Sequence, residues 1–83
     1  MIEVQIYSRT GCHLCDVAEA KLMELQSALE FKLTKELIDG NLDLEREYGD
    51  KVPVILINGA PHDYWRVNQE RFTKAISEIK ASQ

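Results

Sequence analysis

The sequence predicts a small α/β domain whose elements follow in the order β-α-β-α-β-β-α. Near the N-terminus, apolar residues first alternate with polar ones and then recur every three or four positions, which marks a strand followed by an amphipathic helix. A continuous apolar run at 53–57 precedes Asn58-Gly59, a pair typical of hairpin turns. At 83 residues the chain is long enough for one hydrophobic core, so we assign residues 1–83 to a single domain.

The first strand and the first helix meet at a cysteine pair. Ile2, Val4 and Ile6 alternate with polar residues and lead into Tyr7, which predicts a strand of about seven residues. A polar break at 8–11 follows. From there a one-sided apolar stripe predicts a helix that ends near residue 29. Its apolar positions are Leu14, Val17, Ala18, Leu22, Leu25 and Leu29.

The middle of the chain is expected to add a second strand and a short helix. Alternation resumes at Phe31, so the strand lies within 31–38. Asn41 is suited to be an N-cap and Gly49 stands just past the expected end, which predicts a helix over 42–48. Its apolar anchors would be Leu42, Leu44 and Tyr48.

The last part of the chain predicts a hairpin and a closing helix. The run 53–57 is rich in β-branched residues, which favours a central strand buried on both faces. The segment 60–66 should return antiparallel as an edge strand, because Pro61 cannot donate to a ladder. Within it, Tyr64 and Trp65 point to opposite faces, so at most one is core and the other can line a substrate surface. Asn68 can cap the last helix, whose expected core positions are Phe72, Ala75, Ile76 and Ile79.

Composition argues against several kinds of partner and location. The net charge is −4 and the basic residues are scattered, so we expect neither nucleic acid nor an anionic membrane as a partner. No apolar run approaches the ~20 residues that span a bilayer. The N-terminus lacks the pattern of a secretory signal. We therefore expect the protein in the cytoplasm, and we also expect it to be a monomer.

The two cysteines carry the chemical signal. Cys12 and Cys15 are the only cysteines in the chain, and one turn of a helix can bring their sulfurs together. The free N–H groups and the positive dipole end of a helix start stabilise a thiolate at the first cysteine. We therefore predict Cys12 as the nucleophile and Cys15 as the resolving thiol. A buried, inert Cys12 is the alternative, but a polar turn containing Gly11 is a poor place to bury a sulfur.

Two histidines and Arg9 are the candidates for metal binding or for tuning the thiols. Beyond the cysteines only His13 and His62 remain, so no metal site is expected within one chain, while an iron–sulfur cluster that bridges two subunits stays open. Arg9 and His13 can lower the pKa of Cys12. Arg9 can instead pair with a substrate carboxylate or be a solvated turn residue, and His13 can simply face solvent.

The motif and the element order resemble a known family. Tyr-Ser-Arg-Thr-Gly-Cys-His-Leu-Cys-Asp at 7–16 matches a signature of small glutaredoxin-like proteins of the thioredoxin-fold superfamily, and the likeness covers the whole chain. It implies a minimal thioredoxin fold, with a four-stranded mixed sheet and helices on both faces. It also implies that Pro53 is cis and faces the active site, and that Val52 offers backbone groups to an extended thiol substrate.

The same resemblance implies a thiol-disulfide oxidoreductase that reduces protein or glutathione mixed disulfides. Its expected partners are a disulfide-containing protein or small thiol substrate, with a reductase or glutathione as electron donor and no dissociable cofactor. The chain departs from the family at Lys51, where a threonine is common, and at 65–68, where a diglycine is common and lets a carboxylate approach the helix start. Glutathione therefore remains only a candidate co-substrate. The alternative function is a thioredoxin-fold binding or adaptor module with vestigial thiols.

Overall fold

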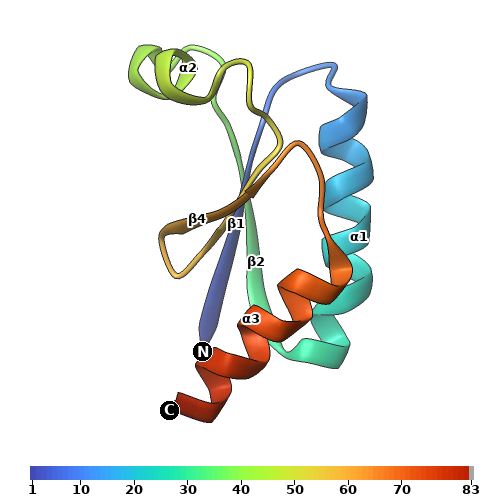
Figure 1. Cartoon of the computed structure of the whole chain (residues 1–83). Coiled ribbons are helices and arrows are strands. Elements are labelled where there is room, and N and C mark those ends of the chain that lie inside the picture. Colours follow the sequence, from blue (N-terminus) through green and yellow to red (C-terminus); the bar gives the residue numbers. More distant parts are fainter. Residues whose placement is uncertain (83) are drawn as a thin grey trace.

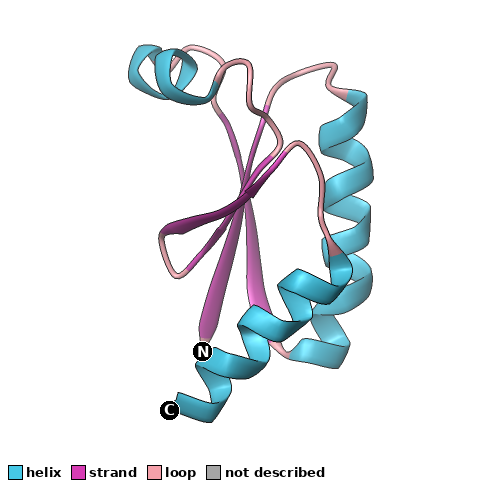
Figure 2. Ribbon diagram, in the orientation of Figure 1, coloured by secondary structure: helices cyan, strands magenta, loops and turns pink. Residues whose placement is uncertain are grey.

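The computed structural model describes residues 1–82 and contains the predicted elements in the predicted order (Figures 1 and 2). The elements are β1 (Ile2–Ser8), α1 (His13–Leu29), β2 (Phe31–Leu37), α2 (Leu42–Tyr48), β3 (Val54–Ile57), β4 (Ala60–Tyr64) and α3 (Gln69–Ser82). No helix in this part of the chain is both long and apolar enough to cross a bilayer.

The strands form one mixed sheet in the order β2-β1-β3-β4. β1 pairs in parallel with β2 and antiparallel with β3, and β3 pairs antiparallel with β4. All residues of β3 are buried, as expected for a central strand that is covered on both faces. β4 lies at the edge of the sheet, where Pro61 costs no ladder hydrogen bond.

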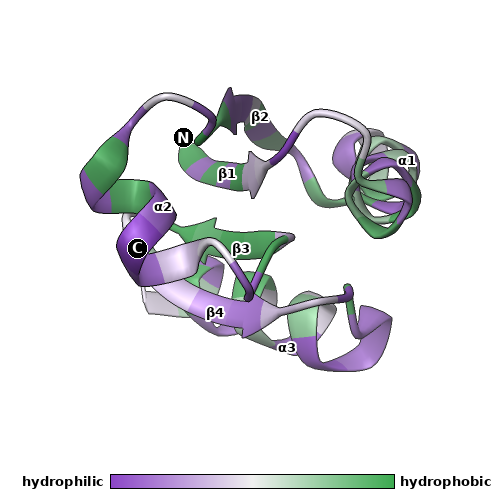
Figure 3. Cartoon of the chain, turned by 90° about the horizontal axis from the view of Figure 1, so that it is seen from above, coloured by the Kyte–Doolittle hydropathy of each residue, from purple (hydrophilic) through white to green (hydrophobic). Residues whose placement is uncertain are grey.

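Helices cover the two faces of the sheet unequally. Figure 3 looks along the molecule from above and shows α1 and α3 on one side of the sheet and α2 on the other. The ring of Tyr7 in β1 lies 5.4 Å from that of Tyr48 in α2. Because neighbouring residues of a strand point to opposite faces, Ile6 points into the core under α1 and α3. The buried core comprises Ile2, Val4, Ile6, Ala18, Leu22, Phe31, Ile55, Ile57, Phe72 and Ile76.

Polar residues fix the turn and the helix starts as predicted. Asn58 and Gly59 have φ of 50° and 85°, the positive values that a two-residue hairpin turn needs. The backbone N–H of Glu3 also donates to the side-chain oxygen of Asn58 at 2.9 Å, which ties the turn to β1. Asn41 and Asn68 cap α2 and α3, each accepting a backbone N–H at 3.1 Å.

Two expectations about helix packing were wrong. Leu14 and Val17 are exposed, because the buried line of α1 passes through Cys15, Ala18 and Leu22. Leu14 and Val17 each precede a residue of that line by one position, about 100° around the helix, so they lie on its flank. In α2 no residue is buried, and Leu42, expected as an anchor, is exposed. These three side chains therefore add little to the core.

Candidate functional site

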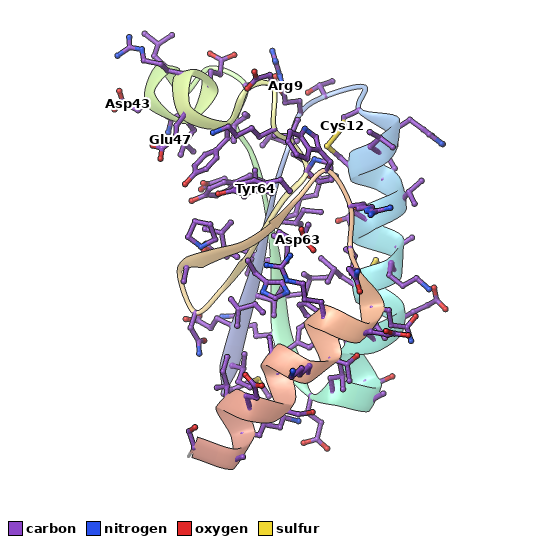
Figure 4. The ribbon with its side chains drawn as sticks, in the orientation of Figure 1. Arg9, Cys12, Asp43, Glu47, Asp63 and Tyr64 are labelled. Atoms are coloured by element: carbon purple, nitrogen blue, oxygen red, sulfur yellow. A yellow bond between two sulfur atoms is a disulfide. The ribbon has the colours of Figure 1, made fainter. Side chains whose placement is uncertain are left out.

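The cysteine pair lies where β1 has ended and α1 begins. Cys12 is the N-cap of α1 in an extended conformation, and Gly11 before it has φ of 76°, which glycine adopts without a Cβ clash. Cys15 lies in the first turn, with a Cα–Cα distance of 5.2 Å to Cys12, within the usual range for a disulfide. The two sulfurs are bonded (Figure 4). The structure therefore shows the oxidised form of the pair.

The two sulfurs differ in accessibility and in their surroundings. Cys15 is 2% exposed, whereas Cys12 is only partly buried at the surface. The backbone N–H of Cys15 donates to the sulfur of Cys12 at 3.2 Å. This N–H is one of the groups that a helix start leaves without an intrahelical acceptor. An incoming sulfur can thus reach Cys12, and a helix N–H is already directed at the atom where negative charge would develop.

Arg9 lies in the turn before the pair and points towards α2. Its guanidinium is 3.5 Å from Asp39 and 3.8 Å from Glu45, and it donates to the carbonyl of Gly49 at 3.2 Å. Within residues 1–82 no hydrogen bond joins this guanidinium to the sulfur of Cys12. The structure thus brings Arg9 to the site through its backbone, whose carbonyl accepts from the N–H of Cys12 at 3.3 Å.

Asp39 is a residue of the site that sequence reasoning did not single out. Its carboxylate accepts from the backbone N–H of Thr10 at 2.8 Å and from the Thr10 hydroxyl at 2.9 Å. The backbone hydrogen bond from Thr10 is the main reason that the pKa of Asp39 lies below its usual value, with help from the Thr10 hydroxyl and from Arg9. The signal that could have found it is the parallel pairing of β1 with β2, because parallel strands end at the same edge of a sheet.

The remaining predicted site residues occupy different surroundings. His13 is exposed at the first position of α1. Pro53 is buried next to β3, and the Val52–Pro53 peptide bond is cis. Val52 is partly exposed, and its backbone N–H and C=O have no hydrogen-bond partner among residues 1–82. The carbonyl of Pro53 accepts from the backbone N–H of Trp65 at 2.7 Å, which fastens the segment after β4 to this loop.

Trp65 and Tyr64 fulfil the expectation that at most one of them is core. Tyr64 is partly buried, and the ammonium of Lys51 lies 5.8 Å from its ring centre. Trp65 is exposed and, with Leu14 and Val17, lines a hollow of about 110 Å³. A larger hollow of about 490 Å³ between β4 and the C-terminal part of α3 lies at the opposite end of the sheet from the cysteines. The smaller hollow lies beside the first turns of α1, the helix that Cys12 caps.

The histidine distant from the pair has a structural environment. The ring of His62 packs edge-on against Phe72, with 6.1 Å between ring centres. Burial is the main cause of its lowered pKa, and the charge of Arg71 adds to it. Among residues 1–82, no three His, Cys, Asp or Glu side chains are placed to hold a metal ion together. His62 therefore belongs to the edge of the core rather than to the cysteine site.

Solved structures of similar proteins share this architecture. A Nitrosomonas europaea protein solved by NMR superposes with a TM-score of 0.80 at 32% identity, covering 89% of each chain. A protein from X. campestris, solved by X-ray diffraction, gives a TM-score of 0.69 at 27% identity, covering 90% of this chain and 96% of that one. Oxidised thioredoxin from Plasmodium falciparum gives 0.63 at 16% identity, covering 94% and 80%, and so shows a common fold. The chain has a thioredoxin fold.

Sequence comparison identifies the family. Proteins of Mycobacterium tuberculosis and Mycobacterium bovis, both described as uncharacterized, are 35% identical over 80 residues, which cover 90% of this chain and 82% of theirs. The family described as "Glutaredoxin-like domain (DUF836)" matches residues 3–77. Because that match spans most of the chain and includes the Cys-x-x-Cys pair, the protein belongs to this glutaredoxin-like domain family.

Proposed function

We propose that the protein is a thiol-disulfide oxidoreductase that reduces protein or glutathione mixed disulfides. One observation carries the proposal: the N-cap sulfur of α1 is accessible, whereas the sulfur bonded to it is buried one turn further on. This asymmetry gives the two thiols different tasks. An accessible thiolate can attack an external disulfide, and a buried neighbour is protected from the same attack until the first sulfur has reacted.

The reaction balances with the two cysteines alone. The thiolate of Cys12 attacks one sulfur of the substrate disulfide, a mixed disulfide forms, and the other substrate sulfur leaves as a thiolate that takes up a proton. Cys15, once deprotonated, attacks the sulfur of Cys12 and releases the second substrate thiol. Two electrons have then moved from the dithiol to the substrate. A reductase or glutathione then restores the dithiol. We propose that the protein does this in the cytoplasm and as a monomer.

The surrounding residues are proposed to support these steps in different ways. A protonated His13 beside Cys12 would favour the thiolate electrostatically, as does the start of α1. Arg9 would act by holding the turn, since its guanidinium is engaged by Asp39 and Glu45. The unpaired backbone groups of Val52, next to Pro53, are suited to hydrogen-bond an extended substrate segment.

Alkylation and turnover of cysteine variants test the proposal. In the reduced protein, Cys12 should react with iodoacetamide near neutral pH well before Cys15, as measured by mass spectrometry of peptides over time. Cys12→Ser should abolish reduction of a glutathionylated peptide, and Cys15→Ser should accumulate the mixed disulfide. Ser27→Ala, at an exposed position of α1, is the matched control and should retain full turnover.

The alternative of an adaptor with vestigial thiols makes the opposite prediction. In that case the parent protein would turn over no disulfide, so Cys12→Ser would have no activity to abolish. A faster reaction of Cys15 than of Cys12 would reverse the assigned roles.

A further inference from the structure

We propose that the hollow between the first turns of α1, the helix that Cys12 caps, and the segment after β4 is a substrate groove. It would select polypeptide disulfides in which the cysteine is followed, in either chain direction, by an apolar side chain and then by an acidic one. The inference rests on the proposed function and specifies the substrate of that same site. We define the groove by its apolar walls, Leu14 and Val17 of α1 on one side and Trp65 on the other, and by two basic residues, Lys21 and Arg66.

The groove walls are large apolar side chains that the fold leaves in solvent. The exposed fraction is 54% for each of Leu14, Val17 and Trp65, which is high for large apolar side chains. They come from two segments far apart in the sequence, which Figure 1 shows side by side where the orange segment after β4 passes the first turns of α1. Ala18 and Val67, which pack towards the core, complete the lining. Contiguous exposed apolar side chains of this kind are typical of interaction sites.

Trp65 is held in place rather than free to rotate into solvent. Its indole N–H donates to the carbonyl of Asp50 at 3.0 Å, and its backbone N–H donates to that of Pro53 at 2.7 Å. The wall is therefore formed before a substrate arrives. A preformed wall lowers the conformational entropy that binding would otherwise cost.

The charge of the groove points to an acidic partner. Both ionisable residues of its lining, Lys21 and Arg66, are basic, although the whole chain carries a net charge of −4. Lys21 pairs with Glu24 at 3.7 Å, a carboxylate that is 71% exposed, so this pair is weak and readily exchanged. For Arg66, no carboxylate lies within 4.0 Å among residues 1–82. The guanidinium is thus free to pair with a carboxylate of the substrate.

The geometry of α1 sets the spacing that a substrate must match. Lys21 lies about 13 Å along the helix from Cys12, at about 1.5 Å per residue, and Leu14 and Val17 lie between them. An extended peptide covers this distance in about four residues, at about 3.3 Å each. Because alternate residues of an extended chain face the same side, the apolar side chain belongs two positions from the substrate cysteine and the acidic one four positions from it.

Glutathione fits this groove less well than such a peptide. It carries carboxylates that the basic residues could pair with, but it has no apolar side chain to lie between Trp65 and the leucine and valine of α1. The groove is therefore expected to favour polypeptide substrates over glutathione.

A panel of chromogenic disulfides tests the inference on the intact, reduced protein. Each substrate is a peptide whose cysteine is bonded to 2-nitro-5-thiobenzoate, and stopped-flow absorbance follows release of the coloured thiolate as the protein dithiol becomes the disulfide. The reference peptides are Cys-Ser-Leu-Ser-Glu and its reverse. Replacing leucine by serine should slow the better of the two about tenfold. Replacing glutamate by lysine should slow it about 1.4-fold to fivefold, the range for an exposed ion pair. The glutathione derivative should also react more slowly.

Variants separate recognition from general reactivity. Lys21→Glu combined with Arg66→Glu should invert the preference, so that the lysine peptide becomes the faster one, and Leu14→Ala with Val17→Ala should erase the preference for leucine. Lys74→Glu and Met23→Ala, exposed changes of the same kinds outside the groove, should preserve both preferences. A charge inversion cannot arise from mere destabilisation of the fold.

Three results would overturn the inference while leaving the oxidoreductase intact: equal rates across the panel, a faster reaction with the glutathione derivative, or preferences that the double Lys21 and Arg66 change and the double Leu14 and Val17 change leave untouched. Absence of thiolate release from every substrate would instead overturn the proposed function, and the groove with it.

Discussion

Reduction of the Cys12–Cys15 bond should lower the free energy of unfolding by about 1–1.5 kcal/mol while leaving the fold intact. The bond joins residues at a sequence separation of 3, and the chain-entropy relation gives about 2 kcal/mol for so short a loop. Against this, the start of α1 stabilises the thiolate of Cys12 in the reduced form by about 0.3–1 kcal/mol. The difference between the two effects favours the oxidised protein slightly.

The same difference in stability predicts the reduction potential of the Cys12–Cys15 pair. In a thermodynamic cycle, the disulfide of the folded protein is harder to reduce than that of the unfolded chain by the same free energy. At about 30 mV per 1.4 kcal/mol, the pair should lie roughly 20–30 mV below an unstructured peptide that contains the same Cys-x-x-Cys. A negative shift suits a protein that donates electrons to substrate disulfides.

Urea unfolding with and without dithiothreitol measures the effect. For a small domain, the expected loss moves the midpoint by about 1 M urea, or the thermal midpoint by roughly 5–10 °C. The Cys12→Ser, Cys15→Ser double variant is the control and should not respond to dithiothreitol. Unfolding on reduction would show that the bond is structural. A reduced form more stable than the oxidised one would mean that the pair is an oxidant, which contradicts the proposed direction of electron flow.

Three other side chains give predictions that separate the site from the core. Asp39→Asn should speed amide hydrogen exchange at Thr10, because the Asp39 carboxylate accepts that N–H. Glu36→Gln, at an exposed position of β2, is the control and should not change it. Unchanged exchange in Asp39→Asn would refute the role of Asp39. His62 has a pKa below 6.5, so the unfolded chain binds more protons and stability falls as pH drops below 6.5 towards the folded value. His62→Leu should remove that part of the pH dependence of urea midpoints, and identical profiles would contradict the assignment. Phe72→Ala should cost about 3–5 kcal/mol in urea unfolding, since Phe72 is 1% exposed; a loss below about 1 kcal/mol would be inconsistent with its burial.

Element boundaries were predictable because they depend on local chemistry. The side-chain oxygens of Asn41 and Asn68 accept backbone N–H groups three residues further along the chain, and Asn58-Gly59 adopts the positive φ values of a tight turn by itself. The apolar run 53–57 was long enough for a strand and too short for a helix, so a strand was the only interpretation that fitted its length. Such signals need no knowledge of distant residues. They fix the order of the elements, and that order with the cysteine motif led to the correct fold family.

The flank of α1 could not be assigned from the same pattern. Periodicity places Leu14 and Val17 on the apolar side of the helix, but it does not say which part of that side meets the sheet and which part meets a loop. That distinction depends on where the segment after β4 passes, which the structure reveals through Trp65. Leu14 and Val17, whose spacing in the sequence suggested core positions, thus line the groove proposed above.

The position of Arg9 changes the expected origin of thiol activation. From the sequence, a basic residue three positions before Cys12 is a natural source of positive charge. In the structure the guanidinium faces two carboxylates, Asp39 and Glu45, and among residues 1–82 it makes no hydrogen bond to the sulfur of Cys12. We propose that Arg9 and Asp39 hold the turn that presents Cys12. In this proposal α2, which buries no residue of its own, contributes through Glu45 and Gly49. We therefore expect activation of the Cys12 thiol to depend on the start of α1 and on His13. We expect α2 to affect the thiol only through the shape of the turn.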